Sequence, residues 1–251
     1  MNKIYGKQHI GMTNKNSFGT DMKIIDYING RNVLIEFQDK YKCRKYVDMS
    51  NFKCGRVSNP YDKTILGVAF IGDGSYSKEN DNECYKCWRN MLGRCFDRKY
   101  QEKYPTYKNT HIDEAWLNFQ NFADWYYENI YHIPGERMEL DKDILYKNNK
   151  LYSPETCIFV PRRINSLLIN NKNKRGEFPV GVDYYRGKFR ARCNTLGTSV
   201  FIGDYSNPYE AFLAYKKYKE NYIKKIANEY KDKIPSKLYD ALYSFIVEEG
   251  D

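Results

Sequence analysis

Charged side chains gather in the segment 138–165. Asp141, Lys142 and Asp143 follow the apolar end of a predicted strand. If that strand continues, the two carboxylates point to the same side and could together hold Mg²⁺, which prefers oxygen ligands. Alternatively, one carboxylate is a ligand and the other caps a turn. The lysine between them is protonated near neutral pH unless it is strongly desolvated, so it suits a phosphate better than the role of a general base.

A second group of cations lies on one predicted strand of the third segment. Lys188, Arg190 and Arg192 alternate with apolar residues, so they share one face of the strand, with Tyr184 and Arg186 just before it. Arginine can fork to guanine edges or to phosphate. The alternative is a solvated outer face. We favour DNA contact because a helix after Asn-Pro is expected to cover the opposite face.

The overall charge makes a polyanion the leading partner. The chain has 251 residues, a formal net charge of +9 and a sequence pI of about 9.0. A basic balance of this size favours nucleic acid, although a basic solvated surface has the same composition. Aromatic residues make up 16% of the chain, too many for a disordered tail.

The cysteines and apolar segments indicate a reduced cytoplasmic location. Seven cysteines are an odd number, the first residues lack a long apolar region, and no run of 18 apolar residues would span a membrane. Cys84-x-x-Cys87 is a lone pair of this spacing. The apolar residues from Cys84 to Cys95 fall at helical spacing, which favours a buried helix stripe over a zinc site.

The chain divides into three predicted segments with an α+β fold. Residues 1–62 form a small β-barrel-like domain or curled sheet, with a tight-turn signal at Asn29-Gly30. Residues 63–177 form a helical region whose glycine-rich start, GVAFIGDGSY, lacks the Walker spacing and is interpreted as a connector, not a phosphate loop. Residues 178–251 carry three short strands and then helices.

Two helices are predicted in the middle segment. The first runs near Glu83–Phe96. The second runs from Asp113 to about Tyr127 and carries aromatic residues at steps of three, the pattern of a core-facing side. These helices precede two further strands, which end at Asp141 and at Val160.

The segment 138–165 resembles the HNH core of phage and homing endonucleases, which is a strand, a loop, a second strand and a helix. Lys142 stands where the family has a histidine general base, and Asn165 matches the last motif residue. The resemblance implies a catalytic site at Asp141, Lys142 and Asn165, with Mg²⁺ or Mn²⁺ as the metal if the site is active. Standard HNH catalysis is not expected, because lysine cannot easily replace a neutral histidine as the general base.

Residues 178–219 resemble the AP2 DNA-binding domain. The matching pieces are Gly181-Val182, Tyr184, Phe189-Arg190-Ala191-Arg192, Ile202-Gly203-Asp204-Tyr205 and Glu210-Ala211-Phe212-Leu213-Ala214-Tyr215. This resemblance implies a three-stranded sheet that recognises the DNA major groove. An HNH core followed by an AP2 domain is the order of mobile phage endonucleases, and the two motifs cover about a third of the chain.

Three functions follow as hypotheses. The first is a DNA-binding protein that keeps a nuclease scaffold without standard HNH catalysis. The second is a metal-dependent endonuclease with Asp141 and Asp143 as ligands. The third is a phage inhibitor that binds RNA or a host nucleoprotein complex of a defence system. We favour the first, with double-stranded DNA as the partner, no required cofactor and no membrane association.

Overall fold

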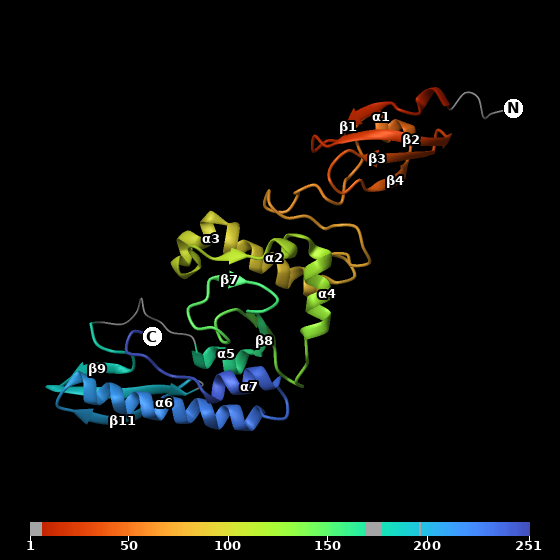
Figure 1. Cartoon of the computed structure of the whole chain (residues 1–251). Coiled ribbons are helices and arrows are strands. Elements are labelled where there is room, and N and C mark those ends of the chain that lie inside the picture. Colours follow the sequence, from red (N-terminus) through yellow and green to blue (C-terminus); the bar gives the residue numbers. More distant parts are fainter. Residues whose placement is uncertain (1–6, 169–176, 196) are drawn as a thin grey trace. The chain divides into compact units, whose positions relative to one another are not determined.

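The computed structural model describes residues 7–168, 177–195 and 197–251 and has a mixed α/β fold (Figure 1). Contacts divide the chain into two compact units, residues 1–128 and residues 129–251. Helices alternate with several small sheets, in agreement with the expected mixture of helix and strand. Among the described residues, no helix combines the length and the apolar character needed to cross a membrane.

After the short 3-10 helix η1 (Lys7–His9), the first unit has an antiparallel sheet whose four strands follow chain order. They are β1 Thr13–Lys15, β2 Asp21–Asn29, β3 Asn32–Phe37 and β4 Arg44–Val47. The edge strands β1 and β4 do not pair with each other in the described sheet, so the barrel-like prediction is wrong. Strands of three and four residues offer few backbone groups for closure, and helix α1 (Met49–Lys53) packs on one face instead.

Alternation along β2 and β3 builds the core of this sheet. Met22 and Ile24 on β2 and Val33 and Ile35 on β3 are fully buried, and they pack with Phe52 of α1. Each large apolar side chain that is fully buried contributes about 1.5–3 kcal/mol relative to its exposed state. The period-two pattern in the sequence therefore fixes which face of each strand turns inward.

The glycine-rich connector packs tightly against the start of a later helix. It forms isolated backbone bridges rather than a regular strand. A Cβ atom at Gly72 would collide with the side chain of Asn118, and one at Gly74 would collide with that of Gln120. The Gln120 amide nitrogen also donates to two connector carbonyl oxygens at 3.1 and 3.0 Å. Close packing thus explains both glycines.

The remaining elements of the first unit are mostly helical. They are α2 Asn82–Phe96, α3 Arg98–Lys103, η2 Pro105–Tyr107, β5 His111–Ile112, η3 Glu114–Leu117 and α4 Phe119–Asn129. The predicted first helix is confirmed as α2. The predicted second helix is wrong as one piece, since it is divided at Asn118. The Phe70 backbone bonds to Leu117 and Phe119 on either side, at 3.0 Å each, and replaces helical hydrogen bonds there.

The stripe on α2 is buried as predicted. Cys84, Trp88, Leu92 and Cys95 face the core, and the Trp88 indole nitrogen donates to the backbone of Trp116 at 2.7 Å. Burial raises the pKa of the Cys84 thiol well above its ordinary value. Among the described residues, no three His, Cys, Asp or Glu side chains are grouped to hold a metal ion. Cys84 and Cys95 are buried, and Cys87 is half-buried.

The described residues of the second unit form two small sheets of their own and three helices. Its elements are β6 Met138–Asp141, β7 Leu151–Tyr152, β8 Ile158–Pro161, α5 Arg162–Leu168, β9 Val182–Tyr185, β10 Lys188–Thr195, β11 Thr198–Tyr205, α6 Pro208–Tyr230 and α7 Ser236–Tyr243. β6 and β8 form an antiparallel pair, and the larger sheet has the order β11-β10-β9.

Helix α6 serves two cores along its length. Near its start, Ala211 and Phe212 pack with Ala191 of β10. Near its end, Ile223 and Ile226 join a core formed by β8, α5 and α7. Figure 1 shows the three-stranded sheet beside the first part of α6 and α7 beside the last part. One continuous helix thus joins the three-stranded sheet to the strand pair and α5.

Candidate nucleic-acid interface

The segment that resembles an HNH core forms two paired strands followed by a helix. Leu140 on β6 lies opposite Phe159 on β8, and α5 begins directly after β8. The Asn165 amide nitrogen on α5 donates to a carboxylate oxygen of Glu139 on β6 at 2.9 Å. Asn165 therefore ties the helix to the strand in this structure.

Asp141 caps the loop that follows β6. Its Oδ1 accepts hydrogen bonds from the backbone nitrogens of Asp143 and Ile144, both at 2.7 Å. Burial raises the pKa of this carboxyl above its ordinary value, against the opposing effect of the two backbone hydrogen bonds. Of the two alternatives for the carboxylates, the turn-capping role is the one that Asp141 fills.

Lys142 lies inside the loop. Its side chain is 5% exposed, and its Nζ donates to Asp143 Oδ1 at 2.5 Å and to the Asn149 carbonyl at 2.7 Å. The Asn149 amide returns a hydrogen bond to the Lys142 carbonyl at 2.8 Å. Asp143 thus pairs with the lysine, and the three charged residues of the predicted site all have partners within the loop.

The second candidate is the face of the β9–β10–β11 sheet that α6 leaves uncovered. Ala191 and Cys193 on β10 are fully buried on the α6 side. Because side chains alternate along a strand, Lys188, Arg190 and Arg192 point to the other side. We call this surface the arginine face. It brings together three of the predicted DNA-binding residues.

Arg190 is held in place at the centre of the arginine face. Its guanidinium donates to both carboxylate oxygens of Asp204, at 2.9 and 3.2 Å. Its Cζ lies 4.3 Å from the ring centre of Tyr185 and 5.3 Å from that of Phe201. The hydrogen bond to Arg190 lowers the pKa of Asp204, as expected for a carboxylate with a cationic donor. Arg190 is therefore a fixed, flat cation between two aromatic rings.

The other cations of the face are more open. Arg192 makes one hydrogen bond to Asp183, at 3.0 Å, and its side chain is 50% exposed. Lys188 and Arg186 are exposed and form no ion pair with the described residues. Arg186 belongs to the tight turn between β9 and β10, with a φ of 49°, and lies 5.1 Å from the ring centre of Tyr185.

Tyr184 does not lie on the arginine face. Tyr184 pairs with Phe189, so both lie on the side of the sheet away from the arginine face, and their ring centres are 5.1 Å apart. Tyr185 pairs with Lys188 and supplies the tyrosine of the arginine face. The two-residue turn Arg186-Gly187 contained this signal, because the residues that flank such a turn pair with each other.

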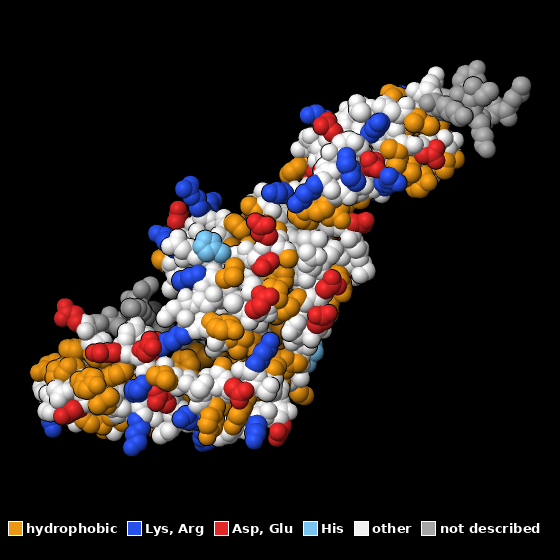
Figure 2. All heavy atoms as spheres, viewed as in Figure 1, with side chains coloured by type: hydrophobic (Ala, Val, Ile, Leu, Met, Phe, Trp, Pro, Cys, Tyr) orange, Lys and Arg blue, Asp and Glu red, His pale blue; other side chains and the backbone are white. Residues whose placement is uncertain are grey.

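The arginine face also contains three residues that sequence patterns did not suggest. Asp183 and Asp204 partner the arginines, and Phe201 adds an exposed ring beside them. Their places depend on strand register, which the sequence pattern left open. Figure 2 shows hydrophobic, basic and acidic side chains interleaved over the visible side of the part formed by β9–β11 and α6.

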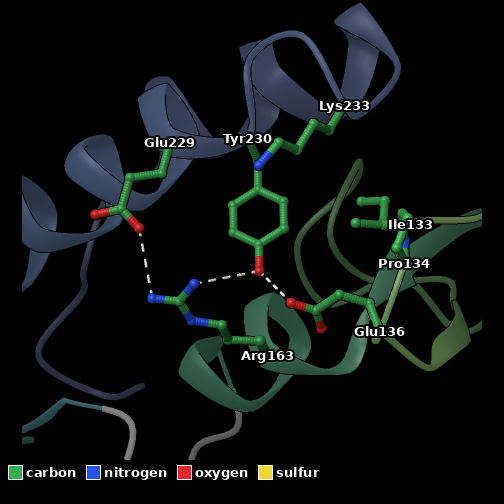
Figure 3. Close-up of a pocket in the computed structure, with 7 residues that line it drawn as sticks. All are labelled: Ile133, Pro134, Glu136, Arg163, Glu229, Tyr230 and Lys233. Atoms are coloured by element: carbon green, nitrogen blue, oxygen red, sulfur yellow. Dashed lines mark hydrogen bonds and ion pairs between the residues drawn. The ribbon is translucent and has the colours of Figure 1, made fainter.

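A pocket of about 420 Å³ lies elsewhere in the second unit, between α5, α6 and the segment before β6 (Figure 3). The Tyr230 hydroxyl donates to Glu136 and accepts from Arg163 at 3.4 Å, and Arg163 pairs with Glu229, also at 3.4 Å. With Lys233, the lining holds two cations and two carboxylates. This balanced charge favours no anion, and the contacts tie α5 to α6.

No protein-family model, no curated protein and no solved structure matches this chain. The functional assignment therefore rests on the geometry of the two candidate sites. Within the described residues, the loop after β6 has charges with internal partners, and the arginine face has charges open to solvent.

Proposed function

We propose that this protein binds double-stranded DNA through the arginine face, formed by β9, β10 and β11. The observation that carries this proposal is the arrangement of Lys188, Arg190 and Arg192 on the side of β10 that α6 leaves open, with Arg186 on the adjoining turn. The resemblance of residues 178–219 to the AP2 domain supports the choice of this surface.

The dimensions of the sheet suit the major groove. Adjacent strands are about 4.8 Å apart, so three strands span roughly 10 Å between their axes, and the groove is about 12 Å wide. Arg186 and Lys188 lie together at the turn between β9 and β10, where they could contact phosphates. Arg192, held by one hydrogen bond, is placed to contact base edges from the centre of the face.

Arg190 is prepared for binding. The carboxylate of Asp204 and two aromatic rings hold its guanidinium, so less side-chain freedom is lost when DNA replaces water around it. The four cations exceed the two carboxylates by two charges on this face. The remaining positive charge favours the approach of a polyanion.

For residues 138–168 we propose an HNH-like scaffold without standard HNH catalysis. Lys142 occupies the position of the expected base and is buried against Asp143, while Asp141 caps the loop. A general base needs access to the attacking water, and these contacts leave the lysine little. The segment then contributes a core that supports α6.

A gel-retardation experiment tests DNA binding. The full chain with Lys188→Gln and Arg192→Gln should bind a duplex at least tenfold more weakly than the unchanged protein. The matched control carries Lys217→Gln and Lys225→Gln, which remove two exposed charges from α6, the helix on the opposite side of the sheet. Equal weakening of both variants would show that net charge, not the arginine face, governs binding.

Incubation with supercoiled plasmid tests the absence of catalysis. With Mg²⁺ or Mn²⁺ added, the proposal predicts retarded plasmid that stays supercoiled. Metal-dependent nicks that persist in a purified, homogeneous preparation and vanish in Asp143→Ala would make the protein a nuclease and contradict the proposed role of the loop.

A further inference from the structure

Phe201 is an apolar side chain in a charged setting. It is 58% exposed and lies on the arginine face, directly across from Arg192. A large apolar side chain in this position gains little from folding, because most of its surface stays in water. An exposed ring beside the arginines of a candidate binding surface therefore points to a contact with a ligand.

A β-bulge places Phe201 on the arginine face. Phe201 and Asp204 are three residues apart, so they would lie on opposite faces of a regular strand. The register between β10 and β11 shifts after Ala191, and Ile202 is the extra residue. As a result, Phe201 lies opposite Arg192 and Asp204 lies opposite Arg190, all on one face.

Support of Arg190 does not by itself explain this ring. Tyr185 already stacks against the Arg190 guanidinium at 4.3 Å, closer than Phe201 at 5.3 Å, and Asp204 holds it through two hydrogen bonds. Phe201 instead extends the surface between Arg190 and its opposite neighbour Arg192. The result is an apolar ring bordered by two guanidinium groups.

We propose that Phe201 forms a binding site for the 5-methyl group of a pyrimidine, thymine above all, in the DNA major groove. This inference rests on the proposed function. The thymine methyl is the apolar group that the major groove displays, and aromatic side chains can contact it, while arginine forks to the O6 and N7 of guanine. Phe201 and Arg192 side by side thus fit a thymine next to a guanine.

Deoxyuridine substitution tests this site. Preferred duplexes are first selected from a randomised pool with the full chain, and each thymine is then replaced by deoxyuridine, which lacks the methyl group. The unchanged protein should bind about fourfold more weakly at one or two positions, the factor that corresponds to about 0.8 kcal/mol for one buried methyl-sized group. If cytosine replaces the thymine at such a position, adding a 5-methyl group to that cytosine should strengthen binding by a similar factor.

Two variants assign the effect to Phe201. Phe201→Ala should bind the thymine and deoxyuridine duplexes equally. Tyr185→Ala, which also removes a ring from Arg190, should still distinguish them. Thermal melts check that both variants are folded. If either variant unfolds, Phe201→Leu, which keeps an apolar side chain, should retain the discrimination, and its loss would count against the site.

The outcomes separate the two proposals. Selected duplexes in which every thymine tolerates deoxyuridine would overturn the methyl site and leave DNA binding in place. Discrimination that survives in Phe201→Ala would do the same. A full chain that retards no duplex would overturn both.

Discussion

Two regions of the second unit place cations beside carboxylates and use them in opposite ways. In the loop after β6, Lys142 is 5% exposed, and its partners Asp143 and Asn149 belong to the same loop. On the arginine face, Arg192 is 50% exposed and has one hydrogen bond to Asp183. The first arrangement stabilises a loop, and the second leaves a cation available to a partner.

The difference shows that residue type alone does not identify a site. The triplet Asp141-Lys142-Asp143 suggests metal and phosphate chemistry. In the structure the chain turns at these residues, and their side chains form hydrogen bonds within the turn. The cations of β10 only alternate with apolar residues, a common strand pattern. They are nevertheless open to a partner, because α6 covers the other face of the sheet. Access to solvent distinguishes the two regions.

The largest effect is expected from removing the buried lysine of the loop after β6. Lys142→Met removes a buried cation with two hydrogen bonds, and it should lower the free energy of unfolding by about 2 kcal/mol. Chemical denaturation measures the change, with the exposed Lys225→Met as the control. DNA affinity should stay the same while the protein is folded. A folded, equally stable variant that no longer binds DNA would assign Lys142 to the interface.

A smaller effect is expected from removing the half-exposed Arg192 of the arginine face. Arg192→Gln should weaken binding to a preferred duplex about tenfold, since a good base contact is worth about 1–3 kcal/mol. Binding to random-sequence DNA should change much less. Arg162→Gln on α5 removes an exposed guanidinium outside the arginine face and serves as the control. An equal loss on both kinds of DNA would identify Arg192 as a phosphate contact.

Lys219 on α6 provides the contrast to Lys142, because it is buried and forms no hydrogen bond or ion pair with the described residues. Burial lowers its pKa below the ordinary 10.5. The native state then binds this proton less tightly than the unfolded state, so the free energy of unfolding rises with pH between the lowered pKa and 10.5. Below the lowered pKa, the cost of burying the charged ammonium reduces the free energy of unfolding by its full amount.

Lys219→Met should therefore raise the free energy of unfolding by about 1 kcal/mol near neutral pH. The gain over the unchanged protein should shrink as the pH rises toward 10.5. Denaturation curves at several pH values measure both effects. A variant that is less stable at every pH would mean that the Lys219 ammonium has a favourable partner.

The smallest effect concerns the carboxylate beside Arg192. Asp183→Asn removes a negative charge and loosens a half-exposed ion pair, a type of interaction worth about 0.2–1 kcal/mol. DNA affinity should therefore rise about twofold to threefold. Asp232→Asn, an exposed aspartate in the turn after α6, is the control. A weaker complex would show that Asp183 is needed to orient Arg192 or contacts a base itself.

Local patterns in the sequence predicted much of the fold. The α2 helix follows from its apolar spacing, and the strand β8 follows from the apolar run Ile158-Phe159-Val160. The alternation along β10 correctly gave the shared face of Lys188, Arg190 and Arg192. These features depend on neighbours within a few residues, which a single sequence displays directly.

Features that depend on distant backbone were missed. The helix break at Asn118 comes from the Phe70 backbone, 48 residues earlier in the chain. The bulge at Ile202 sets the places of Phe201 and Asp204, and strand register puts Tyr185, not Tyr184, on the arginine face. Register and packing partners are tertiary properties. The cations of the candidate site could therefore be predicted from the sequence, and its aromatic and acidic residues could not.

The most direct test of the arginine face is the salt dependence of DNA affinity, measured by fluorescence anisotropy. Each phosphate contact that is lost should reduce the slope of log affinity against log salt by about 0.9. Arg186→Gln with Lys188→Gln should reduce it by about 1.8, and Lys217→Gln with Lys225→Gln should leave it unchanged. If the α6 pair reduced the slope and the sheet pair did not, DNA would bind elsewhere and the account would be contradicted.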